Sequence, residues 1–222
     1  MSLITHFTLD KKYWRNLALP KIIVIHHVFL LGVDALDRYN VSLEQVEYGD
    51  LLQADFIEGH YNLSLKDNLF LDYVKGNDAL HFHSQLFKLI ESCNMADYVF
   101  KADDDIVVNP KVLVKITLEH LSGIQLNKES HLNEQSELNK VSVTSFGCHK
   151  FTDLPVRSPE SKYFIPKQLW STKYPSYYSG AAYMMTIDVA LKLAEVKETT
   201  TVFPIDDVYI GVRGLSSQIK RI

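Results

Sequence analysis

The sequence predicts a single α/β domain, and two observations lead to this expectation. Two segments rich in apolar, β-favouring residues, 21–31 and 98–102, have the character of buried strands. Other segments are expected to be helical, at 65–74, 78–92, 110–120 and 187–196. A length of 222 residues suits one domain with a sizeable core, so we expect residues 1–222 to form that domain.

The composition is that of an ordinary globular protein, with 46% hydrophobic and 23% charged residues. A net charge of −4 argues against a nucleic-acid-binding or membrane-surface protein, because such proteins carry basic patches. The longest apolar run, 22–33, is too short to span a bilayer. Its length fits a signal-peptide core, but two adjacent histidines and the lack of a clear small-residue cleavage site favour a buried strand, so no anchoring segment is seen. Cys93 and Cys148 are too few for a disulfide framework, and they form either one bridge or two thiols.

The first half of the chain is expected to alternate strands and helices after an opening segment, 1–20, without a clear period. The first strand, 21–31, ends at Gly32. Ser64 is placed to cap the helix at 65–74, which Gly76 ends. The other expected elements are a weak helix or turn at 43–50, a short strand at 55–57 and a helix at 78–92.

The second half begins with the strand at 98–102, and Pro110 then starts a helix at the position that proline favours. Thr186 is expected to cap the last long helix, 187–196. The polar segment 122–140 is interpreted as an exposed loop. The remaining expectations are a strand at 141–146 and a loop at 149–170 with a short extended piece at 162–165.

Three consecutive acids, Asp103, Asp104 and Asp105, follow the strand at 98–102 directly. In open α/β sheets, ligands bind beyond the carboxyl ends of the strands. Adjacent carboxylates repel one another, and a hard divalent cation such as Mg²⁺ or Mn²⁺ relieves this repulsion while it binds phosphate oxygens. The triplet therefore predicts a site for a metal and a diphosphate. A solvated acidic turn is the alternative, and the apolar residues on both sides of the triplet argue against it.

Two later segments also carry candidate chemistry. In 174–186, aromatic residues precede Gly180 and two alanines, which suits a flat sugar face or a base. A tyrosine-rich corner of the core is the alternative. Asp206 and Asp207 lie in an apolar setting at the expected start of a short helix, where one of them is a candidate general base toward a hydroxyl. A simple helix cap is the alternative here.

These segments belong to an ordered set that resembles one enzyme family between about Val28 and Gly211. The matching segments are 29–32, 47–58, 61–66, 101–105, 155–157, 174–183 and 206–211. The chain resembles the β-1,3-galactosyltransferase and β-1,3-N-acetylglucosaminyltransferase family, which is glycosyltransferase family 31 and includes the fringe-like enzymes.

The resemblance implies a GT-A-type, Rossmann-like nucleotide-diphospho-sugar transferase fold. It also implies a UDP-sugar donor carrying galactose or N-acetylglucosamine, and a glycan acceptor on a glycoprotein or glycolipid. Transfer would proceed with inversion and form a β-1,3 linkage in protein glycosylation. The cofactor implied is Mn²⁺ or another divalent cation. Family members are anchored in the Golgi membrane on its lumenal side, and no nucleic acid is an expected partner.

The resemblance also assigns roles to single residues. Asp207 matches the catalytic base, and Asp105 together with Asp103 matches the metal ligands of the DxD-type motif. The positions that match donor-binding or site-shaping residues are Asp103, Asp104, Lys66, Arg157 and Gly180.

The chain departs from the family pattern at both ends. Residues 1–20 do not match the family's first strand, so we expect a sheet that lacks it. The chain also ends soon after Gly211, without the histidine metal ligand of the family, so we expect a domain shortened at both ends. These departures favour an alternative, a catalytically inactive relative that binds glycans or partners. The intact triplet and Asp207 favour the enzyme.

Overall fold

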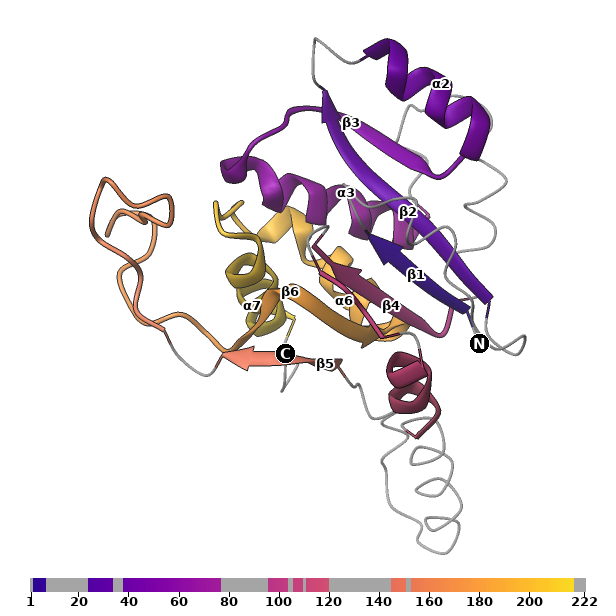
Figure 1. Cartoon of the computed structure of the whole chain (residues 1–222). Coiled ribbons are helices and arrows are strands. Elements are labelled where there is room, and N and C mark those ends of the chain that lie inside the picture. Colours follow the sequence, from indigo (N-terminus) through magenta and orange to yellow (C-terminus); the bar gives the residue numbers. More distant parts are fainter. Residues whose placement is uncertain are drawn as a thin grey trace, which may run out of the picture.

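The computed structural model describes residues 2–6, 24–33, 38–76, 96–103, 106–109, 111–119, 145–150 and 153–217 (Figure 1). Within this part of the chain, no helix has the length and apolar character needed to span a membrane. The labelled elements are β1 (Ser2–His6), β2 (Val24–Val33), α2 (Arg38–Tyr48), β3 (Leu51–Ile57), η1 (His60–Asn62), α3 (Leu63–Lys75), β4 (Tyr98–Ala102), β5 (Ser145–Lys150), β6 (Tyr177–Thr186), α6 (Ile187–Glu195), η2 (Lys197–Thr199) and α7 (Asp206–Ser216). Residues 111–119 form a further helix.

Six strands form one mixed sheet in the order β3-β2-β1-β4-β6-β5. The strands β3, β2, β1 and β4 pair in parallel, and β6 is antiparallel to both of its neighbours. The chain builds the sheet outward from β1 to β3 and then crosses to the other side of β1 to form β4. Such a reversal of strand order opens a crevice at the carboxyl ends of the parallel strands, where α/β proteins bind ligands.

The expectation that the sheet lacks its first strand is wrong. Ser2–His6 lies in the sheet between β2 and β4 and pairs in parallel with both, for example Ile4 with His26 and with Val99. A strand of five residues is too short to reveal a period in the sequence. Its position depends on pairing with two strands that lie far along the chain, and this pairing leaves no local signal.

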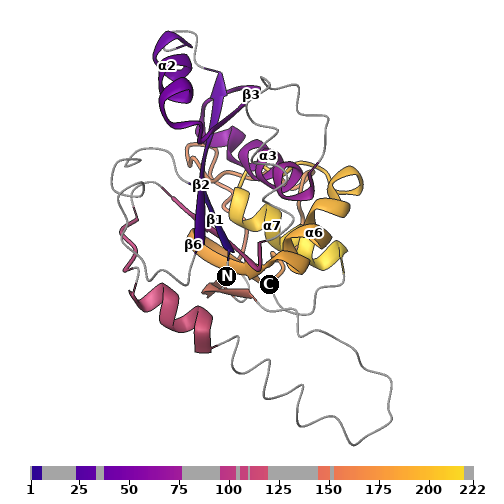
Figure 2. The same ribbon diagram turned by 90° about the vertical axis from the view of Figure 1, so that its right-hand side faces the viewer.

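Helices cover the two faces of the sheet unequally. Helices α3, α6 and α7 lie on one face, and helix 111–119 lies on the other (Figure 2). Alternation along β4 divides its side chains between the faces, because Val99 packs with α3 and α6 whereas Phe100 and Ala102 pack in the cluster with Leu113. Lys101 shares the face of Val99, so its charged side chain points into the layer of α3, α6 and α7.

Most expected elements in the described residues are present, with shifted ends. The strand predicted at 21–31 is β2, which continues through Gly32 to Val33, and the weak helix at 43–50 is the longer α2. Gly76 ends α3 as predicted, because it adopts the left-handed conformation with φ 69°. The strand predicted at 141–146 is described from Ser145 onward as β5. The predictions for 78–92 and 122–140 lie outside the described residues.

Neither of the two residues predicted to cap a helix, Ser64 and Thr186, makes a capping hydrogen bond. Helix α3 begins at Leu63, and the hydroxyl of Ser64 donates a hydrogen bond to the carbonyl of Phe203 instead of capping the helix. Helix α6 does begin directly after Thr186, but the side chain of Thr186 makes no capping hydrogen bond. In both cases a tertiary contact or a buried position outweighs the local preference for capping.

Most of the segment 174–186, with its aromatic residues, Gly180 and two alanines, is strand β6. This ten-residue strand lies between β4 and β5. Tyr174 and Tyr177 are buried in a cluster with Phe203 and Tyr209, so the alternative of a tyrosine-rich corner of the core is correct for these two residues.

Candidate functional site

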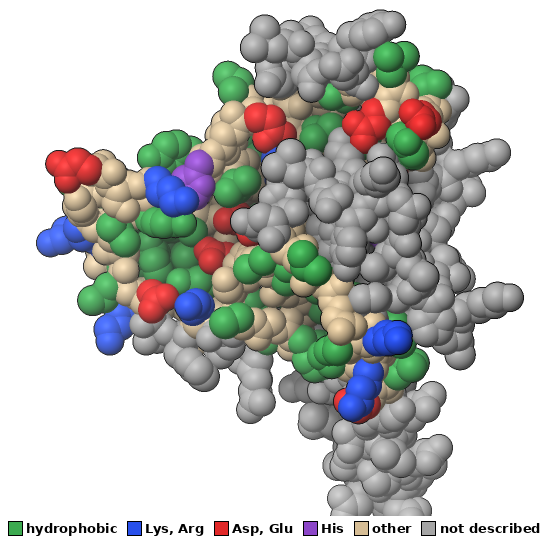
Figure 3. Space-filling view, in the orientation of Figure 1, with side chains coloured by type: hydrophobic (Ala, Val, Ile, Leu, Met, Phe, Trp, Pro, Cys, Tyr) green, Lys and Arg blue, Asp and Glu red, His purple; other side chains and the backbone are tan. Residues whose placement is uncertain are grey.

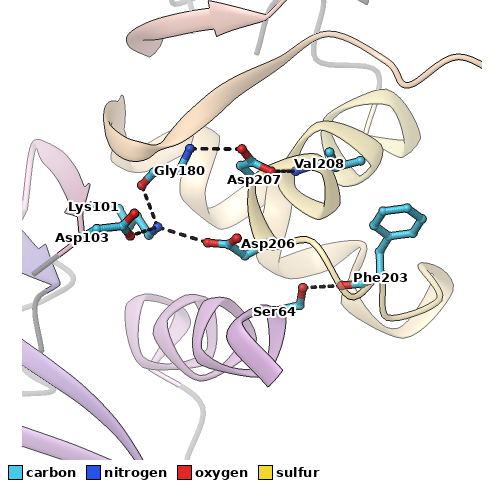
Figure 4. Close-up of polar contacts among 8 residues, drawn as sticks. All are labelled: Ser64, Lys101, Asp103, Gly180, Phe203, Asp206, Asp207 and Val208. Atoms are coloured by element: carbon cyan, nitrogen blue, oxygen red, sulfur yellow. Dashed lines mark hydrogen bonds and ion pairs between the residues drawn. The ribbon is translucent and has the colours of Figure 1, made fainter. Parts of the chain in front are cut away.

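The carboxyl end of β4 meets β6 and the start of α7 at one buried lysine. The Lys101 Nζ donates hydrogen bonds to Asp103 Oδ1 at 2.7 Å, to the Gly180 carbonyl at 2.8 Å and to Asp206 Oδ2 at 3.2 Å. Lys101 is only 2% exposed. We name Lys101, Asp103, Gly180, Asp206 and Asp207 the Lys101 cluster, which Figure 4 shows.

The charge of Lys101 is balanced by carboxylates from three elements. Burial by itself lowers the pKa of Lys101, but the carboxylates of Asp206, Asp67 and Asp103 more than offset this and leave the pKa above its usual value. The ammonium therefore stays protonated at neutral pH. It also lies 5.9 Å from the centre of the Tyr183 ring, which adds a cation–π contact.

Asp67, on α3, is a further buried carboxylate behind the cluster. It is 2% exposed, and its Oδ2 has no hydrogen-bond partner among the described residues. Burial, followed by repulsion from Asp206, raises the pKa of Asp67 well above its usual range, and Lys101 and Arg213 partly counteract this. When it is ionised, Asp67 adds negative potential around Lys101 from the side of α3.

Asp207 differs from its neighbour Asp206 because no cation of the described residues forms an ion pair with it. Its carboxylate accepts hydrogen bonds from the Gly180 N–H at 3.3 Å and from the Val208 N–H at 2.7 Å. Burial and the charge of Asp206 raise the pKa of Asp207 to about 6, although these two N–H groups and Lys101 lower it in part. A carboxylate with a pKa near neutrality is suited to accept a proton.

Gly180 connects Lys101 with Asp207, because its carbonyl accepts a hydrogen bond from Lys101 and its N–H donates one to Asp207. A Cβ at this position would stand 3.4 Å from Asp206 Oδ2, 3.5 Å from the Asp207 Cβ and 3.5 Å from Lys101 Nζ. Any side chain longer than a methyl group would therefore push into the charged groups. Glycine leaves both of its backbone polar groups accessible to Lys101 and to Asp207.

The structure brings together four of the residues that the sequence singled out, namely Asp103, Gly180, Asp206 and Asp207. Lys66 instead forms an ion pair with Glu58 at 2.9 Å. The Arg157 guanidinium donates to the carbonyls of Ile165 at 2.5 Å and Trp170 at 2.7 Å, and so it closes the loop that carries them. Asp104 and Asp105 lie outside the described residues.

Sequence reasoning missed the importance of Lys101 and of Asp67. The available signal for Lys101 was a single charged residue inside an otherwise apolar strand, where a buried charge is costly unless it is paired. For Asp67 the sequence offered no comparable signal, because acidic residues are common on the surfaces of helices.

The start of α7 is held in place by contacts outside the cluster. The Phe203 ring packs edge-on against the rings of Trp170 and Tyr174, with 6.1 Å and 5.7 Å between the ring centres. The Phe203 carbonyl accepts the hydrogen bond from the Ser64 hydroxyl (Figure 4). The Tyr209 hydroxyl lies 3.3 Å from Asn68 Oδ1 on α3. Figure 3 shows the surface of the molecule in the orientation of Figure 1, where hydrophobic side chains gather on the left and acidic side chains are visible beside them.

Close packing between α7 and β6 predicts a large effect of replacing Gly211. A Cβ on Gly211 would stand 2.7 Å from the Tyr177 Cβ and 2.8 Å from the Ser176 carbonyl oxygen, so α7 would have to move. We expect Gly211→Ala to lower the free energy of unfolding by about 1–3 kcal/mol in urea titrations. Gly59→Ala is the control, because nothing lies within 4 Å of its added Cβ and its φ of 168° suits any residue. Equal stability of the two variants would contradict the prediction.

A protein-family model and several known proteins are similar to this chain in sequence. The galactosyltransferase family model matches residues 10–222. Similar proteins include β-1,3-galactosyltransferase 5 of Pan paniscus, 28% identical over 83% of this chain and 51% of that protein. UDP-GlcNAc:betaGal β-1,3-N-acetylglucosaminyltransferase 7 of Rattus norvegicus is 29% identical over 85% of this chain and 41% of its own length. N-acetyllactosaminide β-1,3-N-acetylglucosaminyltransferase 4 of Homo sapiens is 30% identical over 83% of this chain and 41% of its own length.

The chain spans about half, or less, of the length of the curated relatives it matches. The family model, by contrast, is matched along almost the whole chain, from a point between β1 and β2 to the last residue. The matched range includes every residue of the Lys101 cluster. The chain belongs to the galactosyltransferase family.

Proposed function

We propose that the chain is a hexosyltransferase that moves galactose or N-acetylglucosamine from a UDP-sugar to a glycan acceptor. Transfer proceeds with inversion and forms a β-1,3 linkage on a glycoprotein or glycolipid, in the Golgi lumen. The observation that carries the proposal is Asp207, a half-buried carboxylate without a cationic partner among the described residues and with a pKa raised to about 6. The names of the similar proteins support this reaction class.

The arrangement of the sheet supports a GT-A-type fold for this reaction. The Lys101 cluster lies at the carboxyl end of β4, next to the point where the strand order reverses. A nucleotide diphosphate would bind in the crevice at this edge, as ligands do in other open α/β sheets. The antiparallel β6 then brings Gly180 and, through its contacts, Asp207 to the same edge.

In the proposed reaction, Asp207 is the general base. Its carboxylate takes the proton from the acceptor hydroxyl as that oxygen forms a bond to the anomeric carbon of the donor sugar. The bond between the anomeric carbon and the UDP oxygen breaks at the same time, and UDP leaves with the electron pair. Attack from the face opposite UDP inverts the configuration at the anomeric carbon. Asp206 remains paired with Lys101 and is not available as the base.

The carboxylates at the end of β4 fit a divalent cation in their chemistry. Asp103 offers hard oxygen ligands on a side chain that is 46% exposed, and Asp105 would complete the pair. Within the described residues, no group of three or more His, Cys, Asp or Glu side chains is placed to hold a metal. When bound, Mn²⁺ would supply positive charge to the diphosphate of the leaving group. Asp104, Lys66 and Arg157 stay candidates for contacts to the donor or for shaping its site.

The test is release of UDP by the purified chain in the presence of Mn²⁺, with UDP-galactose and UDP-N-acetylglucosamine as donors and a panel of glycan acceptors. Acceptor-dependent UDP release, with a β-1,3 linkage in the product by NMR, supports the proposal. Glycan binding without turnover for any donor and acceptor pair would instead support a catalytically inactive glycan-binding relative.

A further inference from the structure

Both backbone polar groups of Gly180 form hydrogen bonds with other members of the Lys101 cluster, and each bond leads to a different element of the fold. The Gly180 carbonyl accepts a hydrogen bond of 2.8 Å from the Nζ of Lys101, which lies on β4. The Gly180 N–H donates to Asp207 Oδ2 at 3.3 Å, on α7. Lys101 is thereby connected to Asp207 through one residue of β6, although the two side chains form no ion pair (Figure 4).

Lys101 is well suited to hold Gly180 still. An ammonium has three donors, and Lys101 directs them to three acceptors, which lie directly after β4, on β6 and on α7. Its burial, with 2% exposure, excludes water as a competing partner. Movement of the Lys101 side chain would leave the buried carbonyl of Gly180 unsatisfied, which is costly.

Asp207 depends on Gly180 for its orientation relative to the rest of the site. Its other hydrogen bond comes from the N–H of Val208, the next residue of the same helix. That contact moves together with Asp207 and cannot fix the carboxylate against the sheet. Among the described residues, the Gly180 N–H is the hydrogen-bond donor from outside α7.

We propose that Lys101 is a positioning residue that orients the carboxylate of Asp207 by holding Gly180. Lys101 does not touch the acceptor hydroxyl in this proposal; it acts through Gly180. The catalytic consequence rests on the proposed function, because it assumes that Asp207 is the base. The geometric consequence, that Lys101 maintains the hydrogen bond between Gly180 and Asp207, does not depend on any reaction.

The geometric consequence is tested by NMR on the full chain without substrate. We expect the Gly180 amide resonance of the unaltered chain to change with pH with a midpoint near 6, as Asp207 ionises. In Lys101→Met this pH-dependent change should be lost, because Gly180 is released from Asp207. A change of normal amplitude with only a moved midpoint would overturn the proposal, since it would mean that Lys101 acts by charge alone. A Gly180 amide that does not respond in the unaltered chain would overturn it as well.

A double variant separates positioning from charge balance. Lys101→Met leaves Asp206 without its counter-charge, and Lys101→Met combined with Asp206→Asn removes both charges. If Lys101 positions Gly180, the Gly180 response should stay lost in the double variant, which also serves if the single variant does not fold. Its return in the double variant would overturn the proposal. Lys197→Met is the control, because Lys197 pairs with Asp72 and contacts no member of the Lys101 cluster.

The catalytic consequence is measured by steady-state kinetics. We expect Lys101→Met to lower kcat about 100-fold, because a catalytic group displaced by about 1 Å costs a factor of this size. The KM for the donor should change much less than kcat, and Lys197→Met should retain kcat. A kcat within threefold of the unaltered chain would overturn the catalytic role. Lack of turnover in the unaltered chain would instead contradict the proposed function and leave the NMR test of Lys101 intact.

Discussion

Replacement of Asp207 by asparagine is expected to reduce sugar transfer about 1000-fold at pH 7.5, because asparagine cannot accept the proton of the acceptor hydroxyl. The substitution keeps the size of the side chain, and its amide oxygen can still accept the hydrogen bonds from Gly180 or Val208. We therefore expect the loss in kcat, while UDP binding measured by calorimetry stays within about twofold, since Asp207 does not contact the nucleotide in the proposed reaction.

Asp188→Asn is the matched control for this variant. Asp188 also lies in the first turn of a helix, α6, but it is exposed and has no place in the Lys101 cluster. The control should retain full activity. Transfer by Asp207→Asn at more than a tenth of the normal rate would mean that another group accepts the proton.

The rate of transfer should also depend on pH in a direction that the environment of Asp207 fixes. Among the described residues, six titratable groups interact with Asp207, namely Asp67, Lys101, Tyr174, Tyr177, Tyr183 and Asp206. A base must be deprotonated, so kcat should rise as the pH rises through about 6 and reach a plateau above it. A rate that is constant between pH 5 and pH 8 would contradict this assignment.

The raised pKa of Asp207 also predicts how the free energy of unfolding depends on pH. The folded chain binds the proton of Asp207 more tightly than the unfolded chain does, because the pKa is about 6 in the fold and 3.8 for an unperturbed aspartate. Ionised Asp207 therefore lowers the free energy of unfolding progressively as the pH rises from 3.8 to about 6. The full effect is at most about 3 kcal/mol. Asp207→Asn cannot ionise, so its free energy of unfolding should fall less than that of the unaltered chain as the pH rises from 3.8 to about 6, even though it is inactive.

Local patterns in the sequence were sufficient for the elements whose signals are local. The strands at 21–31 and 98–102 are dense apolar runs, and the end of α3 at Gly76 follows from the conformational freedom of glycine. Strand β1 had no such signal, because its five residues gain their place from pairing with β2 and β4. Strand β6 was not among the predicted strands, because Gly180 lies within it and Pro175 just before it, and both residue types are uncommon in strands.

The candidate site was predictable as a list of acids but not as an arrangement. Asp103 and Asp207 were found because carboxylates in apolar surroundings are unusual. Lys101 gains its role from Gly180 and Asp206, which lie 79 and 105 residues further along the chain. The different roles of Asp206 and Asp207 depend on which of the two carboxylates forms the ion pair with Lys101. The sequence shows two adjacent aspartates and does not indicate which of them is paired.

Removal of divalent cations should have an effect as large as the loss of Asp207, but on a different step. We expect EDTA, or Asp105→Ala, to reduce transfer about 1000-fold, because the charge of a metal on the leaving diphosphate contributes several kcal/mol. Added Mn²⁺ should restore the chelated chain but not the Asp105→Ala variant. Asp55→Ala is the control, since Asp55 is an exposed carboxylate on β3.

The affinity for UDP distinguishes the metal ligands from the base. If Asp105 holds a cation as proposed, that cation would also contribute to binding of the diphosphate, so EDTA and Asp105→Ala should weaken UDP binding by at least about tenfold, which is about 1.4 kcal/mol. Asp207→Asn should leave this affinity almost unchanged. Asp103 is bound to Lys101 by a hydrogen bond of 2.7 Å, so a cation that also binds Asp103 has to share its carboxylate with the ammonium. If UDP binds equally well with and without Mn²⁺, the charge opposite the diphosphate must come from the protein itself.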